Sequence, residues 1–225
     1  MKILIQNGHV LDPVTSRNGV YDVLVEDDKI VKVEKGITAE ADKVIDAEGC
    51  YVMPGFVDLH VHFRDPGAEY KEDIFTGAKA AAAGGFTSVV LMANTTPHVD
   101  NEETLSYVTE KGKKTGIHVY TCANVTMDMA GDELTDMETL AKAGAVGFTD
   151  DASPFWTRGL ARKAMQEAAR LHMPISFHEE NPAFIVNNGI NAGAVSQKLG
   201  LGGSDRQAEI DMVRPRPFHR AGNGG

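Results

Sequence analysis

From Phe56 onward, short apolar runs alternate with helical segments, and this alternation limits the folds open to the chain more than any other feature. The apolar runs are bounded by glycine and other turn residues. They read FVDLHVHF, FTSVVLMA, IHVYTCA, AVGFTDDA and PISFHEE. The segments between them carry helix signals, such as the capping-box patterns Asp100-x-x-Glu103 and Thr135-x-x-Glu138. Repeated βα units with apolar strands predict an α/β fold in which helices cover a parallel sheet.

The first part of the chain has a different pattern. Residues 2–54 alternate apolar and polar residues in short runs that are broken by turn signals, such as Asn7-Gly8 and Asp12-Pro13. This pattern predicts a small antiparallel β unit, either a sandwich or a meander. We therefore expect an N-terminal β-sandwich part at 1–55 and the first portion of an α/β barrel at 56–213.

The last residues fit neither part. The segment 214–225, RPRPFHRAGNGG, contains two prolines and has no apolar periodicity. Proline cannot continue a helix, and a basic, glycine-rich segment cannot bury enough apolar surface to fold. We expect this tail to be disordered and unrelated to the rest.

Charge and hydropathy exclude several classes of protein. The net charge is −10, from 22 basic and 32 acidic residues, which argues against nucleic acid as a partner. The sequence has no apolar run near the ~18 residues of a membrane span and no signal-peptide core at its N-terminus, so we expect a cytoplasmic protein without a membrane partner. Its two cysteines, Cys50 and Cys122, are too far apart for a zinc knuckle or a disulfide framework.

A pair of histidines ends the first apolar run of the α/β part. His60 and His62 are two residues apart, so on a strand they share one face, and Arg64 and Asp65 follow almost at once. Two such imidazoles can bind one transition-metal ion at about 2.0–2.1 Å. Hydrogen bonds alone often satisfy a histidine pair, but the position of this pair at the end of a strand favours a metal site.

Further polar residues follow the ends of the other expected strands. They are Asn94, Asn124, Asp150, Asp151, His178 and Glu179. In parallel α/β folds the chemistry gathers at the carboxyl ends of the strands, so these side chains should meet at one rim. Three histidines and a carboxylate could hold one open-sited ion or a bridged pair. The spacing leaves Asp150 and Asp151 as alternatives for the carboxylate.

The same rim carries groups suited to an anionic substrate. A bound divalent ion can activate water and polarise a carbonyl. Arg64 can hold a substrate carboxylate through two hydrogen bonds, and Asn94 can add to them. These ingredients suit hydrolysis of an amide bond in a small anion. Without a metal site, Arg64 would be an ordinary surface arginine and Asn94 an ordinary turn residue.

Several motifs together carry a family resemblance. They are PGFVDLHVHFRDPG at 54–67, MANTTP at 92–97, GFTDDA at 147–152, PISFHEE at 174–180 and GAVSQKLGLGGSDRQAEI at 193–210. The chain resembles the amidohydrolase superfamily and, within it, the bacterial dihydroorotases, from Met1 to about Val213. The resemblance implies a (β/α)8 TIM-type barrel flanked by a small β-sandwich. It also implies zinc, as one or two ions, and interconversion of N-carbamoyl-L-aspartate and L-dihydroorotate in de novo pyrimidine (UMP) biosynthesis.

The resemblance also assigns roles to individual residues. It implies His60, His62 and Asp151 as zinc ligands and His178 as a ligand of a second zinc. The choice of Asp151 over Asp150 rests on this match. It further implies Arg64 and Asn94 as contacts to the substrate carboxylate.

Three departures from the family pattern affect these expectations. Hydantoinases and allantoinases use a carbamylated lysine on the fourth strand, whereas AVGFTDDA has none, which favours the dihydroorotase branch. Ala93 stands where proline is more usual and should leave Asn94 in place. Only about five of the eight βα units of a barrel can be counted, so the family's remaining zinc histidine and its catalytic aspartate have no counterpart. We therefore expect a truncated product that is inactive alone.

The sequence is also compatible with other functions. One is another cyclic amidohydrolase, such as an allantoinase or hydantoinase. A second is an inactive homologue that serves as a partner of aspartate carbamoyltransferase, with which some dihydroorotases associate, and a third is a non-functional fragment. A homo-oligomer that completes the half barrel is a further expectation.

Overall fold

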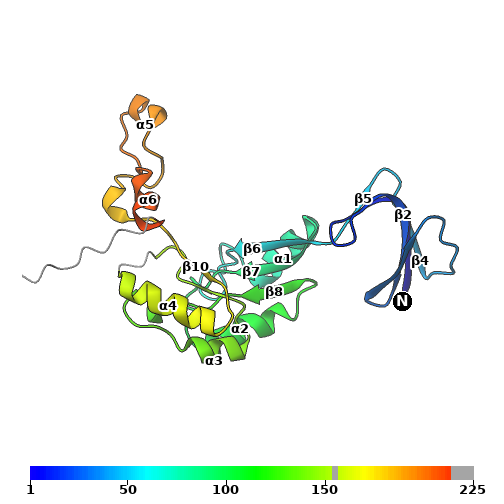
Figure 1. Ribbon diagram of the computed structural model, residues 1–225, viewed down its shortest axis with the longest axis horizontal. Coiled ribbons are helices and arrows are strands. Elements are labelled where there is room, and N and C mark those ends of the chain that lie inside the picture. The colour runs from blue at the N-terminus through cyan, green and yellow to red at the C-terminus, as the bar shows by residue number, and fades with distance from the viewer. Residues whose placement is uncertain (154–156, 214–225) are drawn as a thin grey trace, which may run out of the picture. The chain divides into compact units, whose positions relative to one another are not determined.

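The structure is a computed structural model that describes residues 1–153 and 157–213. The chain divides after Phe56 into two compact units, each with its own sheet structure (Figure 1). Residues 214–225, which the sequence predicts to be disordered, lie outside the described residues.

The first unit is a five-stranded sheet in the order β3-β2-β1-β4, with β5 also paired to β1. Its strands are β1 (Lys2–Asp12), β2 (Arg17–Glu26), β3 (Lys29–Glu34), β4 (Lys43–Asp46) and β5 (Tyr51–Val52). The sheet is mixed, not wholly antiparallel as the sequence predicts. β1 pairs antiparallel with β2, whereas β4 and β5 run parallel to it. β1 is long enough to pair with β4 near its start and with β5 further along.

The second unit alternates strands and helices as the sequence predicts. Its strands are β6 (Phe56–Val61), β7 (Phe86–Leu91), β8 (His118–Thr121), β9 (Phe148–Thr149) and β10 (Ile175–Ser176). Its α-helices are α1 (Ile74–Ala83), α2 (Glu102–Gly112), α3 (Met137–Ala143), α4 (Arg158–Arg170), α5 (Ala194–Lys198) and α6 (Gln207–Val213). Two 3₁₀ turns, η1 (Met127–Met129) and η2 (Pro182–Phe184), interrupt the loops.

Parallel pairing runs through this second unit. β6, β7 and β8 are neighbours in that order (Figure 1), and β7 is parallel to β8. β9 is parallel to β10, and a parallel bridge from Ala123 to Phe148 links the end of β8 to β9. The five strands therefore follow one another in chain order, as in the first part of a (β/α) barrel.

The main hydrophobic core lies between these strands and their helices. α1 packs on β7, α2 packs on β8, and α3 contacts α2. The side chains that are almost fully buried in this core include Ile74, Leu91, Leu105, Leu140 and Phe148. Burial of a side chain of this size stabilises a fold by about 1.5–3 kcal/mol, so this layer holds the strand ends in place.

Two helices begin one residue later than their sequence patterns indicate. Asn101, not Asp100, caps α2 by accepting a hydrogen bond from Thr104 N, and the Asp100 carboxylate accepts one from Asp128 N. Asp136, not Thr135, caps α3. Neighbouring residues in both pairs can cap a helix, and the backbone conformation decides between them.

A search of the described residues found no helix long and apolar enough to cross a membrane.

Candidate metal centre

The polar residues at the strand ends converge on one carboxylate, that of Asp151. Asp151 Oδ2 lies 3.6 Å from His60 Nε2 and 3.3 Å from His62 Nε2. The three residues each offer a ligand atom, and these atoms all lie within 4.8 Å of one another. Two imidazole nitrogens and a carboxylate oxygen are a donor set that suits a first-row transition ion such as zinc.

His178 approaches the same carboxylate from β10. Its Nδ1 lies 3.6 Å from Asp151 Oδ1, the oxygen turned away from the other two histidines. Its Nε2 lies 3.0 Å from Glu180 Oε2. Asp151 therefore stands between the His60–His62 pair and His178, an arrangement that suits one ion or a bridged pair. Sequence reasoning missed Glu180, although its two-residue spacing from His178 was a signal for it.

The structure distinguishes Asp150 from Asp151, which the spacing could not. Asp150 is 2% exposed, and its carboxylate accepts hydrogen bonds from Val125 N, Thr126 N and the Thr126 hydroxyl. Its oxygens are occupied by the loop that follows β8. Asp150 is thus a structural carboxylate, and Asp151 is the one that faces the histidines.

Asn94 lies between two of the candidate ligands. Its Oδ1 is 3.1 Å from His62 Nδ1, and its Nδ2 donates to Asp151 Oδ2 at 3.3 Å. With the amide in this orientation, His62 Nδ1 carries the proton and Nε2 keeps its lone pair for a metal. The structure therefore gives Asn94 an orienting contact that sequence reasoning did not foresee.

His62 is also biased toward its neutral form. Its partial burial, and then the positive charge of Arg64, lower the pKa of His62 below its usual value. A metal competes with protons for imidazole, so a lowered pKa favours metal binding.

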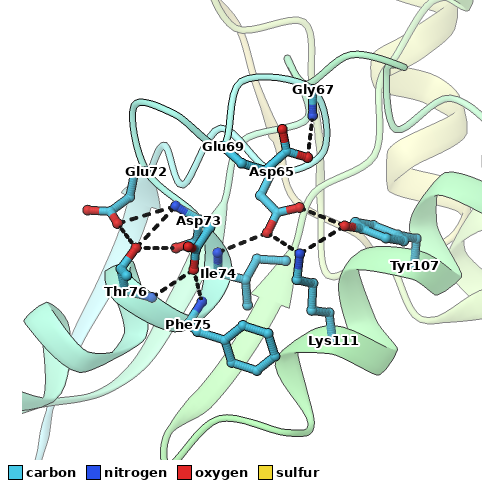
Figure 2. Close-up of polar contacts among 10 residues, drawn as sticks. All are labelled: Asp65, Gly67, Glu69, Glu72, Asp73, Ile74, Phe75, Thr76, Tyr107 and Lys111. Carbon is cyan, nitrogen blue, oxygen red and sulfur yellow. Dashed lines mark hydrogen bonds and ion pairs between the residues drawn. The ribbon is translucent and has the colours of Figure 1, made fainter.

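Arg64 follows His62 in the loop after β6 and is half-buried. Among the described residues no carboxylate lies within ion-pair distance of its guanidinium. Asp65 does not neutralise it, because the Asp65 carboxylate points away, toward α1 and α2 (Figure 2). Asp65, which follows the histidine pair in the sequence, is therefore directed to the two helices and not to the histidines.

Parallel βα units, with histidines and a carboxylate gathered where the strands end, define part of an amidohydrolase-type barrel. Comparison with solved structures agrees with this fold. The L-hydantoinase (dihydropyrimidinase) from Arthrobacter aurescens matches with a TM-score of 0.68 at 23% identity, over 81% of this chain and 41% of that chain. The partial TIM-type barrel expected from the sequence is confirmed.

Sequence comparisons are more specific. The model of the family described as dihydro-orotase-like matches residues 49–214, so the chain belongs to that family. Dihydroorotases from Clostridium acetobutylicum and Clostridioides difficile are 50% and 51% identical to it, each over 212 residues. These matches cover 94% of this chain and 50% of each relative. The chain thus spans about half the length of the curated relatives it matches.

Proposed function

We propose that this chain carries the metal-binding and substrate-binding half of a zinc-dependent dihydroorotase. The reaction is the reversible hydrolysis of L-dihydroorotate to N-carbamoyl-L-aspartate, in which water adds to the ring carbonyl and the ring C–N bond breaks. The observation that carries the proposal is the convergence of His60, His62 and Asp151. The guanidinium of Arg64, which pairs with no carboxylate among the described residues, lies two residues after His62.

The residues present suit zinc. His60, His62 and Asp151 would hold one ion, and His178, on the far oxygen of Asp151, would hold a second. A bound zinc ion lowers the pKa of its water to roughly 7 and polarises the substrate carbonyl. Asp151 would contribute to both positions, because its Oδ2 lies near His60 and His62 and its Oδ1 lies near His178.

Arg64 and Asn94 are the proposed contacts to the substrate carboxylate. The planar guanidinium of Arg64 can donate two parallel hydrogen bonds to a carboxylate, which fixes both position and orientation. Asn94 Nδ2 donates to Asp151 Oδ2 at 3.3 Å and to the Asp151 backbone carbonyl at 3.5 Å, and the longer of these contacts would give way to the substrate carboxylate. Together Arg64 and Asn94 would hold the substrate ring so that its amide faces the candidate metal centre.

Turnover is proposed for the whole protein, because this chain matches only half of its relatives. The resemblance puts the family's catalytic aspartate after the eighth strand, in the unmatched half. Association with aspartate carbamoyltransferase or with further copies of the chain belongs to the same proposal. Co-purification from cell extract tests the first, and sedimentation tests the second.

The deciding experiment measures zinc content and dihydroorotate binding on the purified chain beside His60→Ala, with allantoin as the comparison ligand. We expect zinc binding that depends on His60, and binding of dihydroorotate in preference to allantoin. Zinc binding that is indifferent to His60, or a preference for allantoin, would contradict the proposal.

A further inference from the structure

Burial alternates along the residues that follow β6. Phe63 and Asp65 are 7% and 0% exposed, and a side chain on Gly77 of α1 would meet the Phe63 ring at 2.5 Å. His62 and Arg64, at the intervening positions, are half-buried. The direction of the Arg64 side chain therefore depends on the contacts that hold Phe63 and Asp65.

The backbone of Arg64 needs such support. Its φ is 58°, in the left-handed region that residues with a Cβ adopt at a cost. A strained conformation persists only where surrounding contacts over-determine it.

Asp65 supplies these contacts through three partners (Figure 2). Its Oδ2 accepts a hydrogen bond from Ile74 N at 3.0 Å and lies 2.7 Å from Lys111 Nζ. Its Oδ1 accepts a hydrogen bond from the Tyr107 hydroxyl at 2.9 Å, and Lys111 Nζ also donates to that hydroxyl at 2.9 Å. A closed ring of charge-assisted hydrogen bonds thus ties the residue next to Arg64 to α1 and α2.

Lys111 is itself held in place. Its ammonium lies 5.7 Å from the centre of the Phe75 ring and 5.1 Å from that of Tyr107. Burial acts to lower the pKa of Lys111, but the hydrogen bonds to Asp65 and Tyr107 outweigh it and raise the pKa above its usual value. Lys111 therefore keeps its positive charge through the physiological range.

The next residues of the loop are fixed from the β7 side. Pro66 O accepts a hydrogen bond from Thr96 N at 3.0 Å. A side chain on Gly67 would come within 2.1 Å of Thr96 O, so the two loops are in close contact. Asn94 belongs to the same β7 loop. The anchored turn consequently links the two residues proposed to hold the substrate carboxylate.

We propose that Asp65, held by Lys111 and Tyr107, is a positioning residue that fixes Arg64 for the carboxylate of the substrate. The inference rests on the proposed function but assigns a role to residues outside the metal centre. Asp65 touches neither metal nor substrate, so its effect passes through Arg64.

The test measures dissociation constants of the zinc-loaded chain for L-dihydroorotate and for 5,6-dihydrouracil, the same ring without a carboxylate. Asp65→Asn should weaken dihydroorotate binding by about 10-fold or more, because small misplacements of a binding group are costly. Dihydrouracil and zinc affinities should stay within about 2-fold of the unmodified chain. General damage to the fold would instead weaken all three.

Three further variants keep the test valid even if Asp65→Asn does not fold. Tyr107→Phe removes the two hydrogen bonds of the Tyr107 hydroxyl but leaves the Asp65–Lys111 ion pair, so it should weaken dihydroorotate binding by a smaller factor, about 3-fold. Lys113→Met, which breaks an exposed pair with Glu110 on the same helix, is the matched control and should change nothing. In an Arg64→Met background, Asp65→Asn should have no further effect, because residues that act through one contact are not additive.

The outcomes separate the two proposals. If the unmodified chain binds zinc and dihydroorotate, and Asp65→Asn and Tyr107→Phe bind dihydroorotate as well as it does, the positioning role is overturned and the proposed function stands. An additive effect in the Arg64→Met background also overturns the positioning role. If the unmodified chain binds no dihydroorotate, the proposed function fails and the inference fails with it.

Discussion

Asp150 and Asp151 are adjacent in the chain, yet their carboxylates serve different environments. Asp150 accepts hydrogen bonds from the buried loop after β8, whereas Asp151 faces three imidazoles. One residue therefore supports the fold and the next supports the candidate metal centre. The two roles can be separated experimentally.

Alanine at each position should give opposite results. Asp150→Ala leaves buried backbone N–H groups without a hydrogen-bond acceptor, so it should lower the free energy of unfolding by about 3 kcal/mol. Asp151→Ala should leave that free energy within about 1 kcal/mol but weaken zinc binding by about 100-fold or more, because it removes a direct ligand. Urea unfolding of the metal-free proteins and zinc titration measure the two effects. Equal zinc affinity for Asp151→Ala and the unmodified chain would exclude Asp151 as a ligand.

Asn94→Ala should weaken zinc binding by about 10- to 100-fold, although Asn94 is not itself proposed as a ligand. The reason is that the Asn94 amide fixes the His62 ring with Nε2 free for the metal. Asn18→Ala is the matched control, because it removes another Asn–His hydrogen bond, that to His9 at 2.7 Å, in the first unit. A loss of zinc affinity that is the same in both variants would argue against the orienting role.

Lys111→Met and Lys113→Met should differ strongly in stability. Lys111→Met leaves the carboxylate of Asp65, which is 0% exposed, without its cation, and should cost about 3 kcal/mol. Lys113 pairs with Glu110 on an exposed surface, so its loss should cost less than about 0.5 kcal/mol. Urea unfolding at neutral pH compares them. Similar midpoints would show that the Asp65 ion pair contributes little to the fold.

The two cysteines should react at different rates. Burial raises the pKa of Cys122 to about 11, so at pH 8 only on the order of 0.1% of it is thiolate. Cys50 is exposed. Mass spectrometry after brief iodoacetamide treatment at pH 8 should find the label on Cys50 alone, with Cys122 modified only in denaturant. Equally rapid labelling of Cys122 in the native chain would contradict its burial.

Much of the second unit could be predicted from local sequence patterns. Apolar strands with turn residues between helices indicate a parallel sheet, and parallel strands bring their carboxyl ends to one rim. This is why His60, Asp151 and His178, far apart in the sequence, could be expected to meet. The mixed pairing of β1 is harder to predict from the sequence, because it depends on the register of strands that are distant in the chain.

The supporting contacts could not be predicted in the same way. The hydrogen bond between Tyr107 and Asp65 spans 42 residues, and neither side chain belongs to a spacing pattern that predicts the other. The caps of α2 and α3 were misplaced by one residue because adjacent residues had similar capping ability. The Asn94 contact to His62 required the positions of two loops that only tertiary packing sets.

The central claim is that His60, His62 and Asp151 form a metal centre, and a zinc titration tests it most directly. Isothermal titration with a competing chelator would compare the unmodified chain, His60→Ala and His118→Ala, in which a histidine stacked on Tyr120 is removed. We expect at least one zinc ion per chain, retained in His118→Ala and lost or bound about 100-fold more weakly in His60→Ala. Equal zinc affinity and stoichiometry in all three proteins would contradict it.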